Sequence, residues 1–314
     1  MYCFKRPAIP SKTTAAMIHA QTLRYCDDDC GTITSMKSTR LTALLSAAMF
    51  AHLFAATPSV HAALPPGEKE AKSTLEKSPR HGEYVDITVP DAKTPLKSYI
   101  VYPERKDKAP VVIVIHEIFG LSDWVRSVAD QLAADGFIAI APDMLYGHGK
   151  DGGGTDSFAS RDDVVAAIRG LKSDEVIADL NAVRSYGIKL PAANAKSATI
   201  GFCWGGGQSF AYAVQQPGLD AAVVYYGTPP SAEAMAKIKA PVMGNYGETD
   251  ARITKTVEPT AASMKALEKT YEPHVYEGAG HGFLRAQDGQ NGANLKAAQE
   301  AWPATVEFLR KNTK

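Results

Sequence analysis

From residue 83 onward, apolar and polar positions form short blocks whose spacing predicts alternating strands and helices. Residues 83–89 alternate between apolar and polar side chains as an antiparallel strand does, and residues 96–102 supply a strand to pair with them. Continuous apolar runs further on predict parallel strands buried on both faces. These runs lie at residues 109–115, 137–141, 198–200, 221–226 and 240–246, with a short last strand at 274–276.

Apolar positions with helical spacing fill the segments between these strands. The predicted helices cover residues 122–134, 161–170, 173–186, 208–214, 254–271 and 294–311. Ser122 is expected to cap the first of them, and Pro303 to interrupt or kink the last. This alternation predicts an α/β fold with a mostly parallel central sheet flanked by helices on both faces. In such sheets the functional site lies beyond the carboxyl ends of the strands.

The most informative stretch is Ser197–Gly207, where a short apolar strand runs into Gly-Phe-Cys-Trp-Gly and then a helix. A strand, a tight turn and a helix with G-x-C-x-G at the turn resemble the nucleophile elbow of α/β-hydrolases, with cysteine in place of serine. The following helix would direct free N–H groups at Cys203 and so favour thiolate and oxyanion. The alternative is a buried structural cysteine in a glycine-rich turn.

An acid and a histidine follow two later strands. Asp250 comes after the strand that ends near residue 246, and His281 follows the strand at 274–276. Nucleophile, acid and base in the order Cys203, Asp250, His281 is the order found in α/β-hydrolases. His281 would exchange a proton with the thiol while Asp250 holds the imidazole tautomer. Glu248 is a nearby competitor for the acid, and His281 could instead be a loop histidine.

Composition excludes some classes of function but does not identify one. The chain has 314 residues, of which 45% are hydrophobic and 22% charged, as expected for one large α/β domain. Lysine plus arginine equals aspartate plus glutamate at 34 each, so neither a nucleic-acid surface nor a polybasic membrane patch is indicated. The other histidines of the domain lack metal-ligand spacing, and we assign no metal and no cofactor.

The first 79 residues are expected to lie outside the fold. Residues 36–62 have the layout of a secretory signal peptide, with a basic start, an apolar alanine-rich run and cleavage after Ala62, although a retained anchor is the alternative. Residues 1–35 are interpreted as a mis-assigned upstream extension, and residues 63–79 as a flexible leader to a domain at 80–314. The protein is then exported, to the periplasm, with no stable membrane association after cleavage.

Cleavage after Ala62 would leave Cys203 as the only cysteine of the mature chain, because the other three lie before residue 31. No intramolecular disulfide could then form, although the compartment is oxidising. A single unpaired thiol in an exported protein needs an explanation, and catalysis supplies one. The sequence does not fix the oligomeric state, and we take a monomer as the expectation.

Taken together, these segments resemble the dienelactone hydrolase family over roughly residues 83–311. The resemblance is carried by His116-Glu-Ile-Phe-Gly120, Ala141-Pro-Asp143, Gly201-Phe-Cys-Trp-Gly-Gly206, Tyr225-Tyr-Gly227, Gly247-x-x-Asp250 and Gly280-His-Gly-Phe-x-Arg285. It implies the α/β-hydrolase fold and hydrolysis of a small ester or lactone. These motifs are specific for the family and say little about the substrate.

The resemblance also assigns roles to single residues. Glu117 matches the family's active-site glutamate, which takes part in activating the thiol, and a structural ion pair is its alternative. The backbone N–H groups of Ile118 and Trp204 would form the oxyanion hole. Arg285 matches an arginine that binds the substrate carboxylate, as suits a planar guanidinium. A second such arginine is expected at Arg161, with Arg169 as the alternative.

We therefore expect a cysteine hydrolase that cleaves a small, carboxylate-bearing ester or lactone through an acyl-enzyme. A general carboxylesterase or thioesterase is the alternative within the same class. An exported binding protein that has kept the fold is less favoured, because a binder needs no nucleophile, acid and base together. A redox sensor is disfavoured because the mature chain has no resolving cysteine. The export signal departs from the cytosolic members of the family and weakens the case for dienelactone itself.

Overall fold

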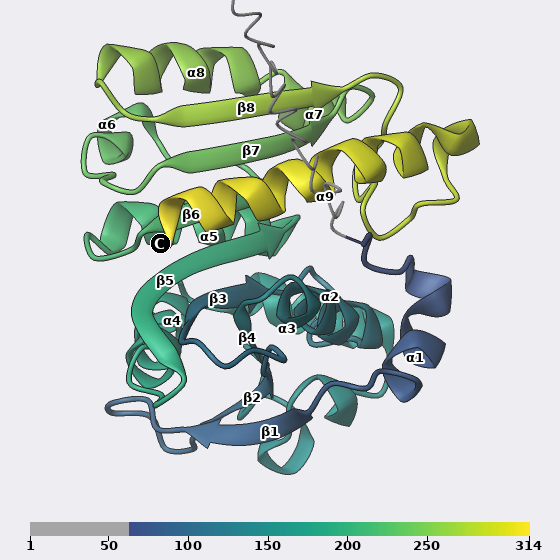
Figure 1. The fold of residues 1–314 in the computed structure, drawn as a ribbon, viewed down its shortest axis with the longest axis vertical. Coiled ribbons are helices and arrows are strands. Elements are labelled where there is room, and N and C mark those ends of the chain that lie inside the picture. Colours follow the sequence, from purple (N-terminus) through teal and green to yellow (C-terminus); the bar gives the residue numbers. More distant parts are fainter. Residues whose placement is uncertain (1–62) are drawn as a thin grey trace, which may run out of the picture. The chain divides into compact units, whose positions relative to one another are not determined.

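The computed structural model describes residues 63–314, which form an eight-stranded sheet with helices on both faces (Figure 1). The strand order is β1-β2-β4-β3-β5-β6-β7-β8. Strand β2 pairs antiparallel with β1 and with β4, and every pairing from β4 to β8 is parallel. The strands are β1 (Gly82–Ile87), β2 (Leu96–Val101), β3 (Ala109–Ile115), β4 (Ile138–Pro142), β5 (Ala193–Phe202), β6 (Ala221–Tyr225), β7 (Val242–Gly247) and β8 (Tyr271–Tyr276).

The helices that connect these strands confirm the predicted α/β architecture. They are α1 (Glu68–Glu76), α2 (Asp123–Ala134), α3 (Arg161–Gly170), α4 (Ser173–Gly187), α5 (Trp204–Gln215), α6 (Ala232–Met235), α7 (Ala251–Thr254), α8 (Val257–Ala266) and α9 (Ala293–Asn312). Three short 3-10 turns are η1 (Lys150–Gly152), η2 (Thr155–Ser157) and η3 (Gln290–Gly292). Ser122 caps α2 as predicted, because its side chain accepts a hydrogen bond from the Val125 N–H.

Strand β3 shows why a continuous apolar run marks the centre of the sheet. All seven of its residues are buried, and successive side chains contribute to opposite faces. Val112 and Val114 belong to the core cluster that includes the buried residues of α2 and α9. Val111 and Ile113 belong to the cluster on the other face, with residues of α4 and α5. Figure 1 shows α9 lying across one face of the sheet.

The structure differs from the sequence prediction at the start of the described chain. Within the leader expected to be flexible, residues 68–76 form helix α1. Ala71 is fully buried, and Leu64 packs against the core, so this segment gains apolar burial that its Pro-, Lys- and Glu-rich composition does not reveal. The predicted upstream extension (1–35) and signal peptide (36–62) lie outside the described residues. Between residues 63 and 314, no helix is both long and apolar enough to cross a membrane.

Two C-terminal helices also differ from prediction. The helix predicted over residues 254–271 is divided into α7 and α8, and Tyr271 already belongs to β8, where it pairs with Val242 of β7. Helix α9 runs past Pro303 as one element. Trp302 and Val306, on either side of this proline, are both buried in the core, which holds the two halves of the helix against the sheet.

Candidate active site

Cys203 occupies the sharp turn between β5 and α5. Its backbone has φ of +55° and ψ of −114°, a conformation that L-residues rarely adopt and that the surrounding structure must hold in place. The Cys203 N–H donates to the carbonyl of Tyr225 at 3.0 Å, and its carbonyl accepts from the Gly207 N–H at 3.2 Å. These two bonds fix the turn to β6 on one side and to α5 on the other.

The glycines around Cys203 are required by close backbone approaches. A Cβ atom on Gly201 would lie 1.9 Å from the carbonyl oxygen of Gly205. One on Gly205 would lie 2.3 Å from the carbonyl oxygens of Ile115 and His116, and one on Gly206 would lie 2.5 Å from that of Tyr225. Glycine is therefore the only residue type that lets β3, β5, β6 and the start of α5 meet at this turn.

We expect Gly205→Ala to lower the free energy of unfolding by about 2 kcal/mol, because the new methyl group would overlap two backbone carbonyls. Gly207→Ala is the matched control in the same helical turn. Its Cβ would meet nothing closer than 3.4 Å, and alanine is the better helix former, so its change should stay within about 1 kcal/mol. Urea denaturation of both variants measures this, and equal losses would contradict the packing argument.

Asp250 and His281 meet at the same edge of the sheet. Asp250 follows β7 and His281 follows β8, and His281 Nδ1 lies 2.5 Å from Asp250 Oδ2. The Asp250 side chain is 8% exposed and that of His281 is 34% exposed, so the imidazole remains accessible. The ring of Tyr226 lies against it, with centroids 5.0 Å apart. With Nδ1 directed at Asp250, Nε2 is left to exchange a proton with a thiol or water.

Glu248, the competing acid, has another partner. Its carboxylate accepts a hydrogen bond from the backbone N–H of Gly278 at 2.9 Å, which ties the loop after β7 to the loop after β8. The geometry thus pairs His281 with Asp250, in line with the sequence interpretation. Cys203, Asp250 and His281 follow β5, β7 and β8 at the carboxyl edge of one parallel sheet.

The environment of Cys203 keeps its thiol protonated in the resting enzyme. Burial, followed by the negative charge of Glu117, raises the pKa of Cys203 to about 11, while a hydrogen bond from the Trp204 backbone N–H acts in the opposite direction. Since the thiolate is the nucleophile, this thiol needs a base or a change in its surroundings before it can react.

Glu117 is buried beside the nucleophile and is paired with Arg285. The Arg285 Nε donates to Glu117 Oε2 at 2.7 Å, and the Tyr226 hydroxyl lies 3.5 Å from Oε1. Burial raises the pKa of Glu117, whereas the guanidinium of Arg285 lowers it. The side chain of Glu117 is 4% exposed, so its charge acts on Cys203 with little screening by water.

Glu117→Gln is expected to lower the pKa of Cys203, because it removes a nearby negative charge. More thiolate would be present at a pH near 8, so alkylation by iodoacetamide should be faster by about tenfold. The pH dependence of the alkylation rate measures the shift. Glu248→Gln, in the loop that carries Asp250, is the matched control, and an unchanged profile in Glu117→Gln would refute the coupling.

Two backbone N–H groups are suited to binding an oxyanion. Trp204 is the first residue of α5, and the Ile118 N–H has no acceptor within residues 63–314. His116 fixes the orientation of the Ile118 N–H. The Met144 N–H donates to His116 Nε2 at 3.2 Å. This leaves His116 Nδ1 to donate to the Glu117 carbonyl at 2.8 Å. This carbonyl and the Ile118 N–H belong to one planar peptide group.

The two predicted carboxylate-binding arginines come together. Arg161, the first residue of α3, and Arg285 both contact Glu68, and both guanidinium groups lie over the ring of Phe119, at 3.5 and 5.1 Å from its centroid. Arg169 stands at the other end of α3 and has no ion pair within the described part of the chain. The geometry therefore favours Arg161 over Arg169.

Sequence reasoning missed Tyr226 and Glu68. Tyr226 directly follows β6, has a positive φ of 41°, and contacts both Glu117 and His281. Its position at the end of a predicted strand, in the Tyr-Tyr-Gly motif, was a usable signal. Glu68 gave no local signal, because its partner Arg285 lies 217 residues further along the chain.

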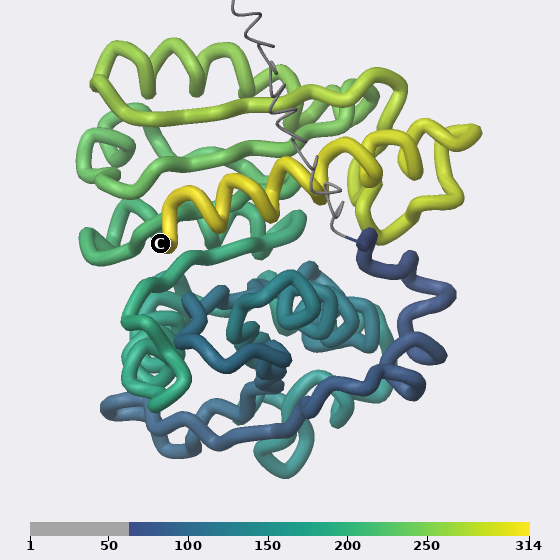
Figure 2. Tube along the Cα trace, in the orientation of Figure 1, coloured from purple at the N-terminus to yellow at the C-terminus, as the bar shows by residue number. Residues whose placement is uncertain are grey.

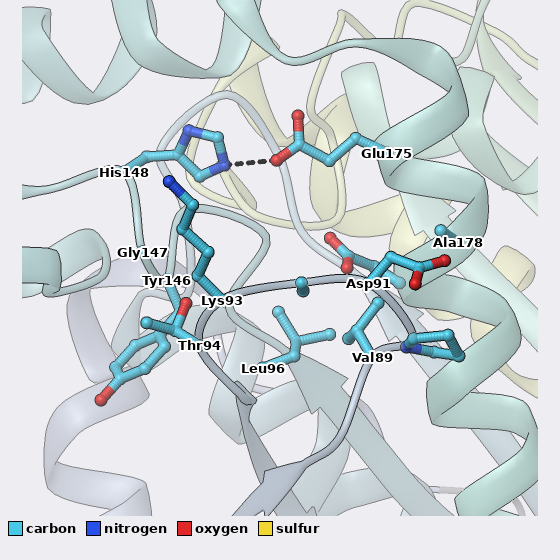
Figure 3. A pocket seen from close by; sticks show the side chains of 13 residues that line it. Val89, Asp91, Lys93, Thr94, Leu96, Tyr146, Gly147, His148, Glu175 and Ala178 are labelled. Carbon is cyan, nitrogen blue, oxygen red and sulfur yellow. Dashed lines mark hydrogen bonds and ion pairs between the residues drawn. The ribbon is translucent and has the colours of Figure 1, made fainter.

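A separate pocket of about 390 Å³ contains titratable groups but none of these residues (Figure 3). It is lined by the loop between β1 and β2 and by residues of α4, and His148 bonds to Glu175 across it at 2.7 Å. Its lining includes neither a cysteine nor a serine, so we place the active site at the strand ends. In residues 63–314 no group of three or more His, Cys, Asp or Glu side chains is arranged to hold a metal ion.

Comparison with known proteins identifies the family of this chain. The sequence model of the dienelactone hydrolase family matches residues 96–313. This chain belongs to the dienelactone hydrolase family. Its family and its curated relatives indicate that it is a hydrolase. A Salmonella typhimurium protein named "Putative carboxymethylenebutenolidase" is 31% identical over 238 residues, covering 71% of this chain and 85% of its own. A relative of the same name from Saccharolobus solfataricus is 30% identical over 251 residues, covering 70% and 95%.

Solved structures of the family share the fold. The crystal structure of a Klebsiella pneumoniae protein named "Putative Dienelactone Hydrolase" superposes with a TM-score of 0.63 at 28% identity, covering 74% of this chain and 99% of its own. The mostly parallel sheet predicted from the strand pattern, and the α/β-hydrolase fold that the resemblance implied, are thereby confirmed.

Proposed function

We propose that this hydrolase cleaves a small ester or lactone through an acyl-enzyme formed on Cys203. The observation that carries the proposal is the contact between His281 Nδ1 and Asp250 Oδ2. These two residues lie in loops that follow β8 and β7, strands of the same sheet in which β5 leads into the Cys203 turn. A histidine oriented by a buried carboxylate, at the same sheet edge as a strained nucleophile turn, supports a catalytic triad. A protein that only binds its ligand would need none of these three residues together.

The reaction begins when the Cys203 sulfur attacks the acyl carbon and its proton passes to His281 Nε2. The carbonyl oxygen becomes an oxyanion, which the N–H groups of Ile118 and Trp204 stabilise. As the C–O bond breaks, His281 returns the proton to the leaving alkoxide. A water molecule, deprotonated by His281, then attacks the thioester carbonyl; the C–S bond breaks, the acid is released, and the Cys203 thiolate takes the proton back from His281.

Glu117 is proposed to assist activation of the thiol. Its partner Arg285 is one of the two arginines suited to binding a substrate carboxylate. A substrate carboxylate that engages Arg285 would weaken the pairing with Glu117, and burial would then raise the pKa of Glu117 further. Protonation of Glu117 would then remove the negative charge that raises the pKa of Cys203, so the thiol would pass its proton to His281 more readily once the substrate is in place.

A substrate panel tests the proposal. Wild type and Cys203→Ala are compared on p-nitrophenyl acetate, which is neutral, and on a lactone that bears a carboxylate. Turnover of the lactone that depends on Cys203 and falls in Arg285→Gln would support a carboxylate-bearing substrate. Turnover of the neutral ester alone would favour a general carboxylesterase or thioesterase. No Cys203-dependent turnover of either compound would contradict the proposed chemistry.

We also propose that the protein is exported to the periplasm, on the basis of the signal-like segment at residues 36–62. N-terminal sequencing of the protein from an osmotic-shock fraction of cells tests this. A mature chain that starts at Ala63 is the expected result, and a chain that starts upstream and stays in the spheroplasts would refute export.

A further inference from the structure

One carboxylate already lies between the two arginines of the candidate site. Glu68, the first residue of α1, contacts Arg285 Nη1 through Oε2, and its Oε1 accepts from Arg161 Nη2 at 3.1 Å. The Glu68 side chain is 42% exposed, whereas that of Arg285 is 19% exposed, so the glutamate enters from the solvent side. A glutamate carboxylate bound by two guanidinium groups makes the contacts that are expected of a bound substrate carboxylate.

Helix α1 is anchored where it presents Glu68. The Glu68 N–H donates to the Arg285 carbonyl at 2.9 Å, and Gln287 Nε2 donates to the Pro65 carbonyl at 2.8 Å. Lys69 pairs with Asp288 at 2.5 Å. In Figure 2 the tube of α1 lies beside the loop that joins β8 to α9, the loop that carries Arg285 and these partners. The backbone contacts show that Glu68 is positioned by the fold as well as by its charge.

The charges of this cluster are balanced without a substrate. Arg161 and Arg285 carry two positive charges, and Glu68 and Glu117 supply two negative ones. A further carboxylate would leave a net negative charge beside the buried Glu117, so it can bind only if Glu68 leaves. The ring of Phe119 lies against both guanidinium groups and would hold them together after Glu68 has left.

We propose that Glu68 is a specificity-determining residue that competes with the substrate carboxylate for Arg161 and Arg285. This inference rests on the proposed function, since it takes these arginines as the site for that carboxylate. Glu68 raises the apparent KM for carboxylate-bearing substrates and acts little on neutral ones. The intact protein therefore prefers neutral esters, because a site that Glu68 partly occupies binds every competing carboxylate more weakly.

Binding is measured first, because it does not depend on hydrolysis. Calorimetric titration with 2-furoate, a small flat monocarboxylate, is carried out on Cys203→Ala and on Cys203→Ala/Glu68→Gln. Loss of an ion pair of this exposure should tighten binding by about fivefold. Glu70→Gln, two residues along the same helix, is the matched control and should leave the affinity as it was. Adding Arg161→Gln to Glu68→Gln should abolish the gain.

Turnover supplies the second readout. The ratio of kcat/KM for the carboxylate-bearing lactone to that for p-nitrophenyl acetate should rise about fivefold in Glu68→Gln, mainly through KM. Equal affinities of the two calorimetry variants for 2-furoate, or a gain that survives Arg161→Gln, would overturn the role of Glu68. If neither compound is hydrolysed but Glu68→Gln still tightens 2-furoate binding, the hydrolase proposal fails while the competition stands.

Discussion

Cys203→Ala is expected to lower kcat/KM for any ester or lactone substrate by about 10⁴-fold or more, because the sulfur forms the covalent bond to the acyl group. The strained turn at this residue is held by backbone bonds to Tyr225 and Gly207, which alanine keeps. The protein should therefore stay folded, and circular dichroism and the denaturation midpoint check this. Steady-state kinetics on the purified variant measures the loss.

If folded Cys203→Ala kept more than about a tenth of the wild-type rate, this account would be contradicted. In that case water would be attacking the substrate directly, and Cys203 would be a structural residue of the turn. Cys203→Ser distinguishes a nucleophile from a packing residue, because it keeps the shape while changing the attacking atom. A weakly active serine variant beside an inactive alanine variant would point to the atom rather than the shape.

Asp250→Asn is expected to lower kcat by about 10³- to 10⁴-fold with a smaller change in KM. The amide N–H₂ of asparagine can donate to His281 Nδ1, which favours the wrong tautomer, and the uncharged amide does not stabilise the imidazolium as the carboxylate does. The Asp250 side chain is 8% exposed, so water cannot readily replace it. The pH profile of kcat, recorded for wild type and variant, shows whether the histidine is affected.

Glu248→Gln serves as the control for Asp250→Asn. Glu248 lies in the same loop and bonds to the Gly278 N–H, a contact that glutamine can still accept. It should keep kcat within about threefold of wild type. Losses of similar size in both variants would mean that the loop, rather than the Asp250–His281 pair, supports the activity.

The strand ends are the part of the site that sequence predicts well. Cys203, Asp250 and His281 each follow a short apolar run, and the carboxyl ends of parallel strands must meet at one edge. The order of strands in the sheet was not needed for this inference. Local patterns were sufficient because each of the three residues is placed by its own strand and turn.

Unlike the strand ends, the ion pairs of the site could not be predicted from local sequence patterns. Glu117 and Arg285 are 168 residues apart, and either could have paired with any of the many charged side chains in the chain. The resemblance to known hydrolases identified both residues, while their contact required the fold. The pairing of Glu68 with Arg161 and Arg285 was not predicted, because composition at 63–79 indicated a leader and gave no reason for a docked helix.

The spacing of apolar residues likewise does not predict backbone strain. Cys203 and Tyr226 both have positive φ at the ends of neighbouring strands. The glycines at 201, 205 and 206 hint at the first of these, because small residues surround it, but no such cluster precedes Tyr226. The role of Tyr226, between Glu117 and His281, therefore emerges only when β6 is placed beside β5.

Trapping of the acyl-enzyme tests the central claim most directly. Wild-type protein is mixed with p-nitrophenyl acetate, quenched with acid, and analysed by intact-mass spectrometry and peptide mapping. We predict one added acetyl group, located on the peptide that contains Cys203, which disappears when the reaction runs to completion before the quench. Product release with no acylated protein at any quench time, or acetyl groups confined to surface lysines, would contradict a covalent mechanism at Cys203.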